Sequence, residues 1–380
     1  MKAALVVAAL ALSSWASRAG CCPLAGHVPH TVVAGPPAPT APAQPARLRV
    51  LLFGDFGDDT CQQEAVARGM AAAQARAPFD LAFSIGDNLY ECGADPRLPG
   101  AAECAFGADG NTVKAGYRPP ADPAFDRLFE RPLASLARGG EPVPLYLALG
   151  NHDVSTWAAC RRGDLPLPRM GRVKACLQVA HQGPLWRMPG RHYVLERGPA
   201  RFVVLDTNLL AGDYGDLSFD AELAFFREAT RGCDARPCFV VGHHPPASAG
   251  DHAPSMTAGS PFSARVERLQ QAASGPIAAW FAGHDHDLQH LRTAAGHDVI
   301  VSGNGSRWRD EKFLRVEPAG SRLLFASTAW GHSVLEVSER GWSVRFESQA
   351  LEPLHCCQAT FPGACQPVTC GPAPAGPTAR

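Results

Sequence analysis

Several short segments of this sequence carry side chains that are able to bind a metal ion, and each begins with a glycine. The stretch GHDHDLQH, residues 283–290, is the richest of them, because His284 and His286 alternate around Asp285 after the apolar run IAAWFA. A glycine lets the backbone turn tightly and approach a bound ion closely. The other candidate side chains follow similar apolar runs, at Asp55, at Asp87 and Tyr90, at Asn151 and His152, and at His243.

Taken one at a time, these residues have simpler explanations. An aspartate after a strand commonly caps a helix, and a histidine near a core commonly makes only structural hydrogen bonds. Five glycine-led clusters after five apolar runs are harder to explain in that way. Carboxylates, imidazoles and an amide oxygen suit first-row ions such as Fe, Mn and Zn. Seven ligands are too many for one ion unless a carboxylate bridges two, and two ions about 3.5–4 Å apart are typical of enzymes that hydrolyse phosphate esters.

The apolar runs themselves predict buried strands. They are four to seven residues long and continuous, as in strands that are covered on both faces. Helical patterns lie between several of them, which predicts an α/β fold whose ligands gather at the carboxyl ends of the strands. The predicted strands are 48–53, 80–85, 143–149, 201–206, 238–241, 277–282 and 297–302. The predicted helices are 62–76, 122–137, 219–231 and 263–273, and after about residue 321 only strands follow, which we expect to complete a second sheet.

In their order along the chain, these segments resemble the motifs of the calcineurin-like metallophosphoesterases. More narrowly, they resemble the small, tartrate-resistant type of purple acid phosphatase. The matching motifs are Asp55-Phe56-Gly57, Gly86-Asp87-Asn88-Leu89-Tyr90, Gly150-Asn151-His152-Asp153, Val240-Val241-Gly242-His243 and Gly283-His284-Asp285-His286. The resemblance covers about residues 47–347. It implies a four-layer α/β/β/α sandwich of two mixed sheets flanked by helices.

The resemblance also implies a role for each matching residue. Two ions share one bridging carboxylate, that of Asp87. The implied ligands of an Fe(III) ion are Asp55, Asp87, Tyr90 and His286. The implied ligands of a second, divalent ion (Fe, Zn or Mn) are Asp87, Asn151, His243 and His284. His152 would lie outside the coordination shell, near the leaving-group oxygen, as an electrostatic stabiliser or general acid.

Tyr90 separates this type from most calcineurin-like phosphoesterases, which have no tyrosine ligand. A phenolate stays deprotonated far below its free pKa of about 10 only beside a strong Lewis acid, and Fe(III) is one. We therefore expect activity at mildly acidic pH and a visible tyrosinate-to-iron band. The implied activity is the hydrolysis of phosphate monoesters by attack of a hydroxide bound to the dinuclear centre.

Other functions stay open at this stage. The same site would also suit a phosphodiesterase, and a non-catalytic surface module would keep the fold without the chemistry. A serine hydrolase is disfavoured, because no GxSxG motif is present. His244 either faces the substrate phosphate or packs in its loop, and His290 is expected in a helix or loop outside the site. The stretches 91–120 and 156–189 are predicted to be irregular loops that influence specificity.

The beginning of the chain predicts export. Residues 1–20 combine Lys2, an apolar run and then small residues, which is typical of a secretory signal peptide. Cleavage would follow Ala19, or a bacterial lipoprotein signal would leave Cys21 as a lipidated N-terminus. No other stretch is apolar for long enough to cross a membrane. We expect an extracellular, periplasmic or envelope-anchored monomer that acts on a small phosphate ester. The net charge of −1, with dispersed charges, gives no sign of a nucleic-acid partner.

The rest of the chain divides into a Pro/Ala-rich linker (21–46), a metallophosphoesterase domain (47–350) and a Cys-rich tail (351–380) whose end is expected to be disordered. Thirteen cysteines in an exported protein predict disulfides. Close spacing favours Cys92 with Cys104, Cys160 with Cys176, and Cys233 with Cys238. The cysteines expected to staple the tail are Cys356, Cys357, Cys365 and Cys370. A zinc site of thiolates is disfavoured, because no pair of CxxC motifs is present.

Overall fold

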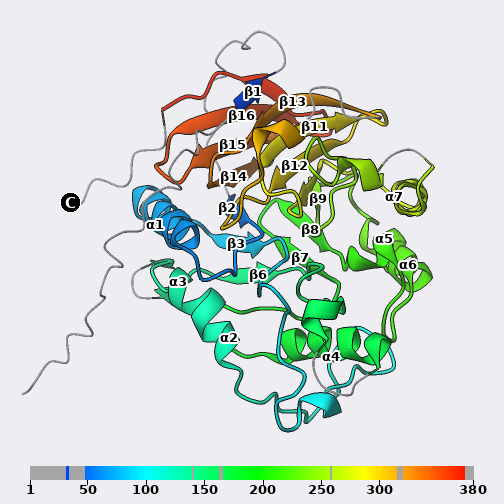
Figure 1. Cartoon of the computed structure of the whole chain (residues 1–380). Helices are drawn as coiled ribbons and strands as arrows, with labels where there is room; N and C mark the ends of the chain where they lie inside the picture. The colour runs from blue at the N-terminus through cyan, green and yellow to red at the C-terminus, as the bar shows by residue number, and fades with distance from the viewer. Residues whose placement is uncertain are drawn as a thin grey trace, which may run out of the picture.

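Two mixed β-sheets pack face to face, and helices cover the outer face of each (Figure 1). The computed structural model describes residues 31–33, 48–138, 141–161, 166–256, 259–314 and 320–372. The predicted signal peptide, Cys21 and the end of the tail lie outside the described residues. The predicted four-layer α/β/β/α sandwich is confirmed.

The first sheet has seven strands within the described residues, in the order β17-β16-β15-β14-β2-β3-β6. The neighbours β2, β3 and β6 are parallel, and the remaining pairs are antiparallel. Its strands are β2 (Leu48–Phe53), β3 (Leu81–Ser84), β6 (Leu145–Leu147), β14 (Gly331–Ser338), β15 (Gly341–Ser348), β16 (Pro353–Thr360) and β17 (Gln366–Val368).

The second sheet has eight strands in the part of the chain that is described, in the order β1-β13-β11-β12-β10-β9-β8-β7. The run from β8 through β9 and β10 to β12 is parallel. Its strands are β1 (Thr31–Val33), β7 (Tyr193–Arg197), β8 (Ala200–Val204), β9 (Cys238–Val241), β10 (Ala279–Ala282), β11 (Leu288–Thr293), β12 (Asp298–Ser302) and β13 (Ser321–Ser327). A separate hairpin joins β4 (Ala137–Arg138) to β5 (Glu141–Pro142).

Several helices begin at a residue whose side chain caps the first turn. The Thr60 hydroxyl accepts a hydrogen bond from the Gln63 amide, and the Ser218 hydroxyl accepts one from Ala221. The α-helices are α1 (Cys61–Arg76), α2 (Pro123–Phe125), α3 (Arg131–Leu133), α4 (Leu167–Ala180), α5 (Asn208–Ala211), α6 (Phe219–Ala229) and α7 (Pro261–Gln271). The π turn η2 (Asp126–Glu130) joins α2 to α3, and the 3-10 turns are η1 (Ala101–Glu103), η3 (Ala158–Cys160), η4 (Ala253–Met256) and η5 (Glu311–Phe313).

Apolar side chains fill the spaces between the four layers. In β2, Val50 and Leu52 enter the core between the sheets, whereas Leu51 and Phe53 belong to the core beneath α1. Alternate residues of a strand point to opposite faces, so one continuous apolar run serves two cores. A third core lies between the second sheet and the helices α6 and α7. The parallel strands are therefore rigidly held, and their carboxyl ends form a stable platform.

Several expectations from the sequence are wrong in detail. The stretch 156–189, expected to be irregular, contains the 14-residue helix α4, whose first turn has a proline but no side-chain cap. His290 lies in the central strand β11 rather than in a helix or loop. β1 lies within the predicted linker and pairs with β13, and β16 from the predicted tail pairs with β15. β1 pairs with a strand far away in the sequence, which short-range pattern does not report, whereas β11 and β16 also pair with strands next to them along the chain.

Five disulfides lie among the described residues. Cys233–Cys238 is confirmed, and the tail is closed by Cys356–Cys370 and Cys357–Cys365. The pairs Cys92–Cys104 and Cys160–Cys176 are wrong. Cys92 instead bonds Cys160, and Cys104 bonds Cys176, over separations of 68 and 72 residues. Tertiary packing of α4 against the loop after β3 brings these distant partners together, and the disulfides indicate an oxidising compartment.

The α-helices in the described part of the chain are at most 16 residues long. None of its helices has both the length and the apolar composition that a bilayer crossing requires.

Candidate metal centre

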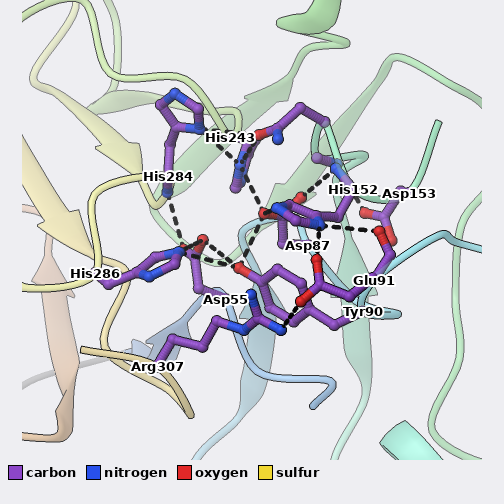
Figure 2. A network of polar contacts seen from close by, with 12 residues as sticks. Asp55, Asp87, Tyr90, Glu91, His152, Asp153, His243, His284, His286 and Arg307 are labelled. Atoms are coloured by element: carbon purple, nitrogen blue, oxygen red, sulfur yellow. Dashed lines mark hydrogen bonds and ion pairs between the residues drawn. The ribbon is translucent and has the colours of Figure 1, made fainter. Parts of the chain in front are cut away.

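The seven predicted ligands converge at one place, beyond the carboxyl ends of five parallel strands. Figure 2 labels all of them except Asn151. Asp55 follows β2, and Asp87 and Tyr90 follow β3. The remaining four come from the loops after β6, β9 and β10, and they are Asn151, His243, His284 and His286. Asp55, Asp87 and His243 are almost completely buried. The structure therefore brings together all the residues that the sequence motifs selected.

Four of the side chains form a first ligand group around the Tyr90 hydroxyl. This hydroxyl is 2.9 Å from Asp55 Oδ1, 2.9 Å from Asp87 Oδ2 and 3.2 Å from His286 Nε2. His286 Nε2 is also 3.4 Å from Asp55 Oδ1. The first ligand group consists of Asp55, Asp87, Tyr90 and His286.

The other side chains form a second ligand group around the Asn151 side-chain oxygen. This oxygen is 2.9 Å from His243 Nε2 and 2.9 Å from His284 Nδ1. The two imidazole nitrogens are 3.3 Å apart, and His243 Nε2 is 3.4 Å from Asp87 Oδ2. The second ligand group consists of Asp87, Asn151, His243 and His284. Asp87 Oδ2 is the atom that the two groups share.

These separations suit metal coordination. Ligand atoms that are each about 2.1 Å from one ion, and at right angles to each other, lie about 3 Å apart. Atoms of Asp55, Asp87 and His243 all lie within 4.8 Å of one another, which is compatible with a bound ion. His286 Nδ1 is buried and has no hydrogen-bond partner among the described residues, and Nε2 is the nitrogen that faces Tyr90 and Asp55. The donor set of carboxylate, phenol, imidazole and amide oxygen therefore fits a pair of first-row ions.

The backbone is strained where it delivers these ligands. Asp55, Asp87 and His284 have φ values of 54°, 53° and 72°, in the left-handed region that non-glycine residues rarely adopt. Such conformations cost about 1–3 kcal/mol each and cluster at functional sites. A Cβ at Gly283 would lie only 2.4 Å from Asp55 Oδ2, and one at Gly150 only 2.2 Å from the Asp87 amide. These two glycines are needed because ligand atoms occupy the space of a side chain.

His152 lies beside both groups without joining either. Its backbone amide donates a hydrogen bond to Asp87 Oδ1 at 2.8 Å, whereas its ring Nε2 is 3.9 Å from Asp87 Oδ2. Its Nδ1 is 2.9 Å from the Glu91 carbonyl oxygen, and its ring packs edge-on to Tyr90. Burial lowers the pKa of His152, although the nearby Asp87 carboxylate partly opposes this. The free Nε2 is therefore available to a substrate atom.

The centre has a strong electrostatic imbalance. Burial and the carboxylates of Asp55 and Asp87 raise the pKa of Tyr90 well above its ordinary value. Burial opposes protonation of His243, but the charges of Asp87 and Asp55 outweigh it and raise the pKa of His243 to about 9. Two close carboxylates therefore favour a positive charge at the centre. A bound cation would supply this charge and would lower the pKa values of Tyr90 and His243.

The sequence did not select two further residues beside the centre. The Arg307 guanidinium lies 3.9 Å over the Tyr90 ring and pairs with Asp58. Arg307 comes soon after β12, so a search of every strand end would have found it. His252 stacks 4.0 Å from the ring of His284 and makes a 2.9 Å hydrogen bond with Asp285, and no sequence pattern marks it.

Asp153, the last residue of the motif Gly150-Asn151-His152-Asp153, connects two loops of the centre by hydrogen bonds. Its carboxylate accepts hydrogen bonds from the amides of Gly150 at 2.7 Å, Asn88 at 3.0 Å and Leu89 at 3.1 Å. The Gln178 side chain on α4 donates a further one at 2.9 Å. Asp153 thereby joins the loop after β6 to the loop after β3, and α4 supports both.

Two other histidines have structural positions. His244 is buried, and its Nδ1 is 3.0 Å from the Thr207 hydroxyl, so it packs in its loop. Burial and the neighbouring His243 lower the pKa of His244 well below its ordinary value. His290 Nδ1 is 3.0 Å from His355 Nε2 in the core, away from the centre.

The fold and the site define a metal-dependent phosphoesterase. Residues 48–288 match the calcineurin-like phosphoesterase family, and the chain belongs to this family.

Its relatives are acid phosphatases. It is 25% identical over 293 residues to tartrate-resistant acid phosphatase type 5 of Rattus norvegicus, covering 70% of this chain and 74% of that protein. It is 25% identical over 286 residues to purple acid phosphatase 7 of Arabidopsis thaliana, covering 69% and 71%. The solved structure titled "GAP50 the anchor in the inner membrane complex of Plasmodium" shares the fold, with a TM-score of 0.59, 19% identity, and coverage of 84% of this chain and 90% of that one. The chain is thus homologous to the tartrate-resistant and purple acid phosphatases.

Proposed function

We propose that the protein is an exported acid phosphatase that hydrolyses phosphate monoesters at a dinuclear metal centre. The observation that carries the proposal is the division of seven ligand atoms into two groups that share Asp87 Oδ2. A single ion would need only one such group. The homology to acid phosphatases supports the same activity.

The proposed ligands of an Fe(III) ion are the first ligand group, and those of a divalent ion (Fe, Zn or Mn) are the second. When bound, such a pair polarises phosphoryl oxygens and makes water nucleophilic near neutral pH. The chain then has to hold the ester in line. His252, whose side chain is about one-third exposed beside His284, is suited to bind a phosphate oxygen. Burial opposes protonation of His252, but its hydrogen bond to the Asp285 carboxylate and the negative charge of Asp285 outweigh burial and raise the pKa of His252, which favours the cationic form that binds phosphate.

His152 is proposed as the residue that stabilises or protonates the leaving oxygen. Its Nδ1 is held by the Glu91 carbonyl, which leaves Nε2 directed away from that bond. Its ring is only partly exposed, so a proton on Nε2 is shielded from bulk water. Positioned general acids of this kind commonly contribute about 10²–10⁴-fold to the rate.

Metal analysis with a visible spectrum on protein from an exporting host tests the centre. We expect two ions per chain and a tyrosinate-to-iron band, and a colourless iron-loaded protein would contradict the assignment of Tyr90. Turnover of p-nitrophenyl phosphate but not of its bis ester would support monoester specificity. The opposite preference would indicate a phosphodiesterase, and no turnover of either by the metal-loaded protein would indicate a non-catalytic binding module.

Export as a monomer is part of the proposal. The disulfides among the described residues support passage through an oxidising compartment. Mass spectrometry of the mature N-terminus would distinguish cleavage after Ala19 from lipidation of Cys21. Sedimentation of the purified protein would measure its oligomeric state.

A further inference from the structure

A cavity of about 590 Å³ lies directly beside the metal centre. Its wall comes from the loops after β6 and β8 and from α4, and Asn151 of the second ligand group is one of its lining residues. The other lining residues that matter here are Ser155, Trp157, Gly212 and Tyr214. A cavity of this volume is in the range that binds small molecules.

The position of His152 connects this cavity to the chemistry. The Trp157 ring is 4.7 Å from the ring of His152 and nearly perpendicular to it, and the His152 ring lies 4.3 Å from that of Tyr90. The three rings therefore form a row from the first ligand group to the cavity. A leaving group whose oxygen meets His152 would continue outward past Trp157. With His152 at the leaving oxygen, as proposed above, the cavity lies on the side of the alcohol part of the substrate.

The lining has a distinct chemical character. Trp157 is 38% exposed, and no other large hydrophobic side chain among the described residues is as exposed. An indole face that is open to a cavity favours a flat ring, by stacking and by burial of apolar surface. Ser155 also lines the cavity, and its buried hydroxyl has no hydrogen-bond partner among the described residues. An unsatisfied buried hydroxyl favours a ligand with a polar atom at the same place.

The wall is held firmly before any ligand binds. The Cys92–Cys160 disulfide joins the loop that carries Trp157 to the loop after β3. The buried Lys174 ammonium on α4 donates hydrogen bonds to the carbonyl oxygens of Ser155 at 2.6 Å and Cys160 at 3.4 Å. A preformed wall loses little conformational entropy on binding, which is a property of ligand sites.

We propose that this cavity binds the alcohol part of the substrate, and that the preferred substrate is a phosphate monoester whose alcohol carries an aromatic ring. The inference rests on the proposed phosphatase function and adds the substrate class. Trp157 stacks on the ring, and the Ser155 hydroxyl pairs with a polar atom of the same group. The phosphate itself stays with the metal centre.

Three variants at two positions test the cavity from different walls. Trp157→Ala removes the stacking face, and Trp157→Phe retains a ring at the same place. Gly212→Leu fills the cavity, since a Cβ there meets no atom within 4 Å and the φ of 174° is extended backbone that any residue adopts. Each variant is assayed with 1-naphthyl phosphate and with glycerol 2-phosphate, which has no ring. The variant-to-wild-type ratio for each substrate cancels the different intrinsic reactivities of the two esters.

We expect Trp157→Ala and Gly212→Leu to raise KM for 1-naphthyl phosphate about tenfold, a size typical of stacking on an aromatic side chain. KM for glycerol 2-phosphate and inhibition by inorganic phosphate should change less than about twofold, and Trp157→Phe should restore most of the preference for the ring. Equal losses for both substrates would mean that Trp157 only supports His152, and unchanged constants would mean that the cavity is not used. Either result would overturn the inference and leave the phosphatase function standing. Wild-type protein that hydrolyses neither ester would instead refute the proposed function.

Discussion

The Arg307 guanidinium lies 3.9 Å over the centre of the Tyr90 ring, and ion pairs with Asp58 and Glu91 hold it there. The contact places a permanent positive charge against the phenol that is the proposed ligand of Fe(III). Arg307 acts in the direction of lowering the pKa of Tyr90, against the larger effects of burial and the carboxylates. A cation on the face of a phenolate draws its electrons toward the ring.

We expect Arg307→Leu to move the visible band of the iron-loaded protein to longer wavelength. Without the cation, the phenolate electrons are higher in energy and less energy moves them to the metal. Arg127→Leu is the matched control, because Arg127 pairs with Asp59 on the surface. An unshifted band in Arg307→Leu would show that the guanidinium only closes the edge of the site.

The sharing of Asp87 predicts how metals are lost. Asp87→Asn keeps an acceptor for the His152 amide but removes the charge that both groups use. We expect the bound metal to fall well below one ion per chain, whereas His284→Gln should leave about one. Elemental analysis after gel filtration measures both. Equal losses in the two variants would argue against a bridging carboxylate.

His152→Ala should lower kcat about 10²–10⁴-fold for esters of poor leaving groups, with metal content unchanged. The loss should be smaller for p-nitrophenyl phosphate, because p-nitrophenolate departs without a proton. The control is His297→Ala, which removes an imidazole from the turn between β11 and β12. Equal rate losses for both kinds of ester would contradict a role at the leaving oxygen.

The disulfide Cys92–Cys160 should contribute more stability than Cys233–Cys238. Their sequence separations are 68 and 5 residues. In the chain-entropy description, closing these loops is worth about 4 and about 2 kcal/mol respectively. Thermal unfolding of the two double Cys→Ser variants compares them. A smaller loss in the Cys92/Cys160 variant would mean that packing of α4 holds this loop without the bond.

The buried pair His290–His355 should make the protein less stable in acid. Burial and the neighbouring His290 lower the pKa of His355 from 6.5 to about 3. The unfolded chain therefore takes up a proton on this imidazole near pH 6.5, whereas the folded protein does so only near pH 3. Between these two pH values, the free energy of unfolding decreases as the pH falls. His355→Phe preserves the stacking on Phe325. The variant's free energy of unfolding, measured in urea between pH 4 and 7, should fall less steeply than that of the wild type, by at most about 1.4 kcal/mol per pH unit. Parallel slopes would contradict this.

Much of the centre was predictable because its ligands follow a local rule. Each one comes just after a continuous apolar run and a glycine, as at Gly86-Asp87 and Gly283-His284. The runs themselves appear as β2, β3, β6, β9 and β10. His252 and Arg307 escaped the same search, since the first lies within a loop and the second is a cation, which a search for metal ligands does not select.

Some of the errors arise from distance along the chain. Spacing paired Cys92 with Cys104, although α4 and the loop after β3 bring Cys160 and Cys176 to them. β1 pairs along its whole length with β13, which lies far away in the sequence. Hydrogen bonds between distant segments leave no periodic signal in either segment.

By itself, the sequence determined the α/β class, the order of the ligand motifs and the chemical nature of their donors, since apolar runs and strand-end glycines are local properties. The tertiary structure decided which ligands share Asp87, that His152 stands outside both groups, and that Trp157 opens a cavity beside it. These relations join residues from different loops, and their distances depend on how two sheets pack rather than on any one segment.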